Sequence, residues 1–144
     1  MHSRLSAAIL VLVPLAAAPA GATERIRLVE RATGEKVVPL THAPDAIGDL
    51  LVFSNPLHDA ANVTGVGTSR GFCVRVEVGK WWQCQWTMQL AGGALQVAGP
   101  YPDEGDCEFA IVGGTGHYAG RRGTLKVHAR DAAHSAYDFV VELL

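Results

Sequence analysis

The chain has 144 residues, with 12 Lys and Arg residues against 14 Asp and Glu residues, so its formal net charge is −2. This mixed, mildly acidic composition without a basic block argues against nucleic acids and anionic membranes as partners. The length predicts a single domain, large enough to bury a hydrophobic core.

The first 22 residues show the three parts of a secretory signal peptide. A short basic start precedes an apolar run over residues 5–18, and small residues up to Ala22 suit a cleavage site. A membrane anchor is the alternative, but the run is short, Pro14 interrupts it and Pro19 follows it. We therefore expect residues 1–22 to be removed and residues 23–144 to be secreted, extracellular or periplasmic, with no membrane attachment.

Strand patterns fill the rest of the chain, whereas no window of a dozen residues sustains helical spacing with caps. Apolar and β-branched runs, separated by Gly, Pro, Asn and Asp, predict strands over residues 26–30, 50–54, 63–78, 81–90, 94–98, 107–112, 124–129 and 137–143. Asn55 and Pro56 are expected to stop the second strand, and residues 99–106 to form a loop. Short strands at this spacing are typical of an all-β sandwich or of a closed barrel.

A glycine-rich stretch lies between the sixth and seventh predicted strands, with glycines at positions 113, 114, 116, 120 and 123. Glycine permits sharp turns and close backbone approach, so we expect a tight bend there, with Tyr118 as a packing anchor. A phosphate-binding loop is the alternative. The spacing of Gly114, Gly116 and Gly120 misses the dinucleotide fingerprint, and no Gly-Lys-Ser/Thr follows.

Three cysteines follow the predicted signal peptide, which in an exported protein favours one disulfide and one remaining thiol. In a hairpin turning near Gly79, Cys73 and Cys84 share one face. With a four-residue loop they would lie directly opposite each other and could form a disulfide. We therefore predict the pair Cys73 and Cys84, with Cys107 as a buried thiol.

No metal or cofactor site is predicted. The histidines show no ligand-pair spacing. The acidic loop at Asp103, Glu104 and Asp106 lacks the pattern of a calcium loop, so we interpret it as solvated. No Gly-x-Ser-x-Gly motif is present to indicate a serine nucleophile.

Four motifs in order resemble those of allene oxide cyclases: residues 48–55, 71–74 and 97–101, followed by the glycine-rich stretch 111–123. The last also resembles the matching motif of plant dirigent proteins. Both families are eight-stranded antiparallel barrels, and the resemblance covers residues 24–144. It implies a single all-β domain, an eight-stranded antiparallel β-barrel of the allene oxide cyclase and dirigent type.

The resemblance implies four catalytic residues. The asparagine that holds an oxygen-positioning water in allene oxide cyclases corresponds to Asn55, the pocket cysteine to Cys73, and the Gly-Pro-Tyr tyrosine to Tyr101. The first-strand glutamate corresponds to Glu30, whereas a second water-holding asparagine is replaced by Ala32. An inward glutamate would have a raised pKa and could act as an acid or a charge stabiliser, while an outward one would be solvated.

Four residues are predicted to bind the ligand. The resemblance places Leu51 in the pocket wall, and we assign Phe53 from the same strand to the ligand as well. Trp82 and Trp86 lie on the hairpin face that carries the cysteines, where they could form the floor of a cavity for a flat apolar molecule. The alternative is that these indoles only fill a core.

These features predict a secreted barrel that binds an apolar small molecule in its lumen and guides its cyclisation or isomerisation without a cofactor. Restricted geometry and a few polar groups aimed at developing charge would supply the catalysis. The alternatives are a non-catalytic ligand binder, a dirigent-like guide for coupling, and a structural barrel with a packed interior. The resemblance to trimeric plant proteins makes a homo-oligomer, dimer or trimer, an expected assembly.

Overall fold

The computed structural model describes residues 23–144, which form nine strands and one short 3-10 helix. The strands are β1 (Glu24–Arg31), β2 (Glu35–Val38), β3 (Leu50–Asp59), β4 (Gly65–Glu77), β5 (Trp81–Leu90), β6 (Gly93–Pro102), β7 (Cys107–Gly114), β8 (Gly123–Ala129) and β9 (Ala136–Leu143), and the helix η1 spans Gly116–Tyr118. The predicted signal peptide, residues 1–22, lies outside the described residues. From residue 23 onward, no helix is long and apolar enough to cross a membrane.

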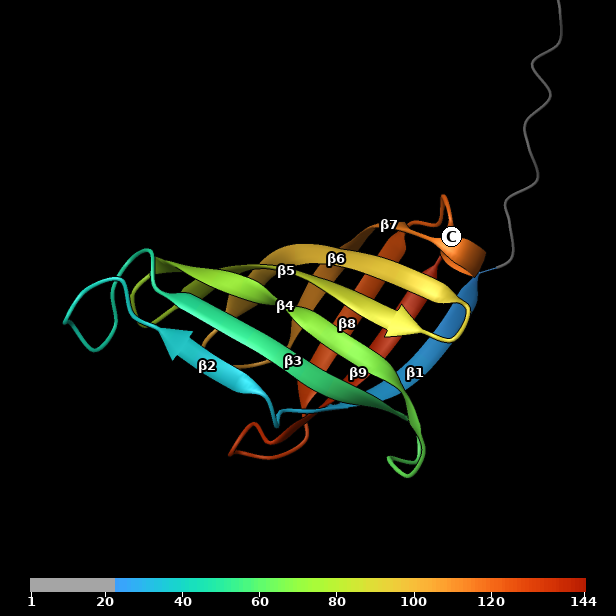
Figure 1. The fold of residues 1–144 in the computed structure, drawn as a ribbon, viewed down its shortest axis with the longest axis horizontal. Coiled ribbons are helices and arrows are strands. Elements are labelled where there is room, and N and C mark those ends of the chain that lie inside the picture. Colours follow the sequence, from blue (N-terminus) through green and yellow to red (C-terminus); the bar gives the residue numbers. More distant parts are fainter. Residues whose placement is uncertain (1–22) are drawn as a thin grey trace, which may run out of the picture.

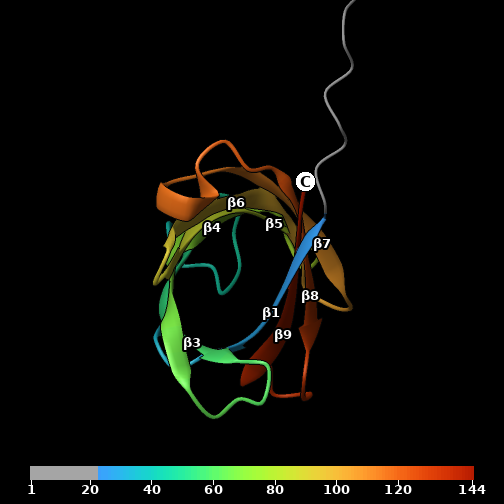
Figure 2. The ribbon, with the colours of Figure 1, turned by 90° about the vertical axis from the view of Figure 1, so that its right-hand side faces the viewer.

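All strand pairs are antiparallel, and the sheet closes on itself. The order is β1-β9-β8-β7-β6-β5-β4-β3-β2, and β1 also pairs with β3, where Leu28 lies opposite Asp59 and Glu30 opposite Leu57. Figure 1 shows the resulting barrel, and the turned view in Figure 2 shows the strands arranged in a ring. The prediction of a closed eight-stranded barrel is confirmed, with β2 as an additional strand on β3.

The largest differences from the sequence prediction concern β2, β3 and β6. The short strand β2 was not expected, because its four residues are all exposed and show no alternation of buried and exposed side chains. β3 runs through Asn55 and Pro56, where the proline lies opposite Thr68. Proline is tolerated in sheets near bulges, and the register shifts directly after Leu57. β6 extends to Pro102 because pairing with β5, Tyr101 opposite Trp82, outweighs the local loop signal of Gly99-Pro100.

The glycine-rich stretch forms the predicted bend at one end of the barrel. Tyr118 of η1 is buried there, and Gly93 at the start of β6 has a φ of 143°. A Cβ on Gly93 would lie 2.1 Å from the carbonyl oxygen of Thr115, so only glycine allows the two backbones to approach this closely. This end of the barrel is filled by aliphatic side chains without solvent exposure, namely Leu95, Leu125, Val141 and Leu143, with Met88 beside them.

Candidate ligand-binding site

The other half of the barrel is hollow. A cavity of about 300 Å³ lies where β4 and β6 end and where β3 and β5 begin. Six aromatic side chains from five strands line it, namely Phe53, Trp86, Tyr101, Phe109, Tyr137 and Phe139. Leu51 and Val127 contribute aliphatic side chains to the lining. The titratable groups of the lining are Glu30, Glu35, Asp103 and His134. The interior is therefore not fully packed, unlike that of a purely structural barrel.

Trp86 is the centre of the aromatic wall. Its ring contacts Phe109 edge to face, with ring centroids 4.5 Å apart, and Phe53 at 6.1 Å. Tyr101 stacks on Phe109 at 6.5 Å, with an angle of 21° between the ring planes. Edge-to-face and offset packing fix ring orientations, so these side chains form a preorganised wall.

Glu30 is buried in the wall of this cavity, only 5% exposed. Its Oε1 accepts a hydrogen bond of 3.1 Å from the Nδ2 of Asn55, and its Oε2 has no hydrogen-bond partner among the described residues. Burial raises the pKa of this carboxyl to about 7, against the opposing effects of Ser69 and Asn55, and repulsion from Glu35 adds to the rise. Glu30 therefore exchanges protons near neutral pH.

Asn55 lies behind this carboxyl and does not line the cavity. Its Nδ2 also donates to Glu35 at 3.3 Å, while its Oδ1 accepts the backbone N–H groups of Thr33 and Gly34 at 3.1 Å and 2.9 Å. A side-chain amide has two donor hydrogens and two acceptor lone pairs, so the protein occupies all four positions. In this structure Asn55 connects the turn between β1 and β2 to β3 and positions both carboxyl groups.

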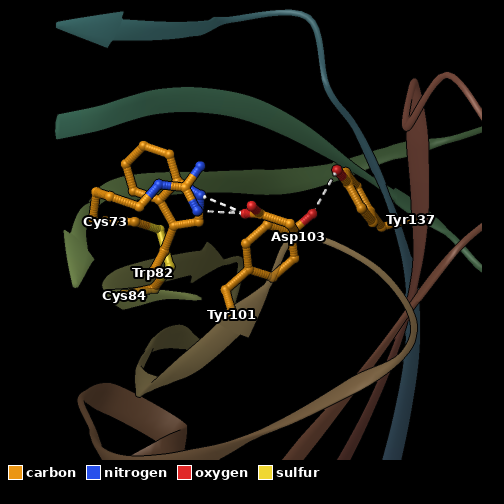
Figure 3. Close-up of a disulfide and its surroundings, with 7 residues drawn as sticks. Cys73, Trp82, Cys84, Tyr101, Asp103 and Tyr137 are labelled. Carbon is orange, nitrogen blue, oxygen red and sulfur yellow. Dashed lines mark hydrogen bonds and ion pairs between the residues drawn. A yellow bond between two sulfur atoms is a disulfide. The ribbon is translucent and has the colours of Figure 1, made fainter. Parts of the chain in front are cut away.

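Two tyrosines face each other across the cavity. The hydroxyl oxygens of Tyr101 and Tyr137 are 3.1 Å apart, and either can be the donor. Figure 3 shows the two hydroxyl groups pointing toward each other. Burial raises the pKa of both phenols, so each remains a neutral hydrogen-bonding group at physiological pH. This hydroxyl pair is therefore a polar group within the aromatic wall.

Cys73 and Cys84 lie directly opposite each other and form the predicted disulfide, which lines the cavity (Figure 3). Cys73 thus presents a disulfide sulfur to the cavity rather than a thiol. Cys107 is the free cysteine of the described chain, half-buried rather than fully buried. Burial, with a smaller effect from Asp106, raises the pKa of its thiol to about 12, so it is not a ready nucleophile.

Arg75 and Trp82 border the opening of the cavity without lining it. The Arg75 guanidinium donates to Asp45 at 2.8 Å and to Asp103 at 2.6 Å, and its central carbon lies 4.0 Å from the ring centroid of Trp82. The indole N–H of Trp82 donates to the same carboxylate of Asp103 at 3.1 Å. This cluster ties the loop before β3 and the loop after β6 to the barrel end.

The structure brings most of the predicted site residues together. Glu30, Leu51, Phe53, Cys73, Trp86 and Tyr101 all line the cavity, while Asn55 and Trp82 lie beside it. The site predicted from the sequence lacked seven lining residues, namely Glu35, Asp103, Phe109, Val127, His134, Tyr137 and Phe139. The inward alternation of Tyr137, Phe139 and Val141 in β9 was a usable signal, whereas Glu35 belongs to the strand that carries no pattern. From residue 23 onward, no cluster of three or more metal-ligating side chains is present.

Residues 22–144 match the sequence model of the family described as dirigent-like protein. The chain belongs to the dirigent-like family. Among solved structures, a pyocyanin demethylase is similar over 84% of this chain and 100% of its own, with a TM-score of 0.73 and 23% identity. A pterocarpan synthase dirigent protein is similar over 85% of this chain and 95% of its own, with a TM-score of 0.74 and 16% identity.

The exo-specific intermolecular Diels-Alderase AbnU is similar over 85% of this chain and 98% of its own, with a TM-score of 0.66 and 13% identity. At these identities the likeness shows a shared fold. The family match and the barrel together confirm the predicted resemblance to the dirigent-like barrel superfamily.

The raised pKa of Glu30 predicts a pH dependence of stability. The folded carboxyl has a pKa of about 7 against an ordinary value of 4.5, so its contribution is fully present below pH 4.5 and is lost as the pH rises through 7. Relative to Glu30→Gln, the wild-type protein should lose about 3 kcal/mol of unfolding free energy across this window. Urea denaturation at pH 4.5 and pH 8 measures the difference.

Glu108→Gln, at an exposed carboxyl, is the matched control and should keep the wild-type profile. Asp59, Asp131 and Glu142 have lowered pKa values and therefore titrate below this window. Parallel profiles for the wild type and Glu30→Gln would show that the buried carboxyl titrates normally.

Proposed function

We propose that this dirigent-like barrel binds a flat, largely apolar small molecule in its cavity and guides the cyclisation or isomerisation of that molecule without a cofactor. The observation that carries the proposal is the aromatic wall around Trp86, which encloses a buried carboxyl with a pKa of about 7. Ligand sites in proteins are typically such apolar concavities with a few fixed polar groups.

The family and the structural neighbours support this proposal. The pterocarpan synthase and the Diels-Alderase are named for the synthesis of a compound and for a cyclisation, and the pyocyanin demethylase is named for a small-molecule substrate. These names describe the neighbours. For this chain they are consistent with a barrel that acts on a small molecule inside its lumen.

Two physical effects would act on a bound molecule. The fixed rings would restrict the ligand to few conformations, so that reacting atoms are held close together before reaction. Glu30 would give or take a proton near neutral pH, and the hydroxyl of Tyr101 would donate to an oxygen that becomes negative. Both groups line the same cavity. Glu30 lies on β1 and Tyr101 on β6, and these two strands are opposite each other in the closed order of strands around the barrel.

Binding can be tested with the neutral fluorescent probe N-phenyl-1-naphthylamine, whose emission rises in an apolar environment. We expect saturable binding to the wild type. Leu51→Trp, which places an indole in the cavity, should weaken binding at least about tenfold because the ring occupies the ligand volume. Leu50→Trp is the matched control on the same strand, since residue 50 is solvent-exposed. Equal affinities for both variants would exclude the cavity as the binding site.

Turnover separates a catalyst from a binding protein. If the barrel is catalytic, conversion of an unsaturated epoxide should fall by about 100-fold in Glu30→Gln, because a proton-transfer group typically contributes that much or more. Tyr101→Phe should have a smaller effect, and both variants should still bind the naphthylamine probe. Conversion by the wild type that is no faster than the uncatalysed reaction would favour the non-catalytic alternative, in which the barrel only binds a molecule or orients it for coupling started by another enzyme.

We also propose that the protein acts outside the cytoplasm, as the expected signal peptide implies. The mass of the protein recovered from its native culture medium or periplasm is the measurement. A mass corresponding to residues 23–144 with one disulfide is expected, whereas an unprocessed chain found only in the cytoplasm would contradict export.

A further inference from the structure

The cavity has an unbalanced charge. Its described lining includes the carboxyl groups of Glu30, Glu35 and Asp103, and no lysine or arginine. The charge of Asp103 is already compensated, because the guanidinium of Arg75 donates to it at 2.6 Å. Glu30 and Glu35 have no such cationic partner within residues 23–144.

These two carboxyl groups are held at one place. The Nδ2 of Asn55 donates to an oxygen of each, at 3.1 Å to Glu30 and 3.3 Å to Glu35. Glu30 is buried and its second oxygen lacks a hydrogen-bond partner in the described chain, whereas Glu35 is exposed at the opening. Two neighbouring carboxyls that share one neutral donor repel each other when both are ionised, and a cation placed beside them relieves that repulsion.

The rings that line the same cavity suit the same ligand. Aromatic faces attract cations through their quadrupole, and groups of such rings recognise quaternary ammonium ligands in other proteins. The barrel already contains one such contact, between Arg75 and Trp82, at 4.0 Å. Trp86, Phe109 and Phe139 present further rings to the cavity, and the described lining contains no lysine or arginine that could contact them.

We propose that the cavity selects planar aromatic ligands that carry a positive charge, such as an N-alkylated heteroaromatic ring. The charged end lies beside Glu30 and Glu35, and the ring lies among Trp86, Phe109 and Phe139. The inference rests on the proposed function, since it specifies the class of molecule that the same cavity binds. An anionic aromatic ligand is disfavoured by the same two carboxyl groups.

A pair of isosteric probes tests the inference. N-Methylquinolinium and 1-methylnaphthalene have nearly the same shape and differ by one positive charge. Each is titrated against bound N-phenyl-1-naphthylamine at pH 8, with 1-naphthoate as the anionic member of the set. We expect the cation to displace the probe at an about tenfold lower concentration than the neutral hydrocarbon, and the anion to bind most weakly.

Variants that replace the two carboxyl groups with neutral amides test whether these groups cause the preference for the cationic probe. Glu35→Gln, at an exposed position that does not endanger folding, should reduce the preference for the cation to within about threefold, and the double variant with Glu30→Gln should remove it. Glu108→Gln is the control for a carboxyl outside the cavity and should retain the preference.

The outcomes separate this inference from the proposed function. Equal binding of the cationic and neutral probes, or a preference that persists in both glutamine variants, overturns the inference and leaves binding in the cavity intact. Failure of all three probes and of N-phenyl-1-naphthylamine to bind overturns both.

Discussion

The short pairing of β1 with β3 is the constraint on which the site depends. It covers only residues 28–30 of β1, whereas β1 pairs with β9 along its whole length. Without it, the strand that carries Glu30 would be the edge of an open sheet, and the carboxyl would be solvated. Closure instead buries Glu30 against Asn55 of β3, and this burial is the main cause of its raised pKa.

The barrel has its cavity at one end because different kinds of residues line the two ends of its interior. At the end near η1, Leu95, Leu125 and Val141 fill the interior without solvent exposure. Toward the other end, glycines lie beside two of the rings that line the cavity. A Cβ on Gly71 would lie 2.2 Å from the Cβ of Trp86, and one on Gly99 would lie 2.9 Å from Phe109. Neither glycine has a side chain to contribute to the interior beside these rings, and a cavity remains.

The fold could be predicted largely from the sequence, because the buried sheet faces impose a two-residue alternation that is visible in β5 and β9. The same alternation places Cys73 and Cys84 on one face of the sheet, and a strand register that sets them opposite each other allows their disulfide. The residues of the site were harder to predict from the sequence. β2 is exposed at all four positions and shows no alternation, so Glu35 was missed. The direction of the Asn55 amide depends on contacts with a turn distant in sequence, which no local pattern reveals.

Asn55 shows how one side chain can serve both the fold and the chemistry. Its two acceptor positions bind the turn that leads into β2, and its two donor positions bind the carboxyls of Glu30 and Glu35. A neutral amide organises these acids without neutralising them, whereas a lysine or arginine would satisfy their charge within the protein, as Arg75 does for Asp103. Glu30 is buried without a compensating charge, which destabilises the folded chain, so a cation bound beside it, as we propose, would stabilise the protein.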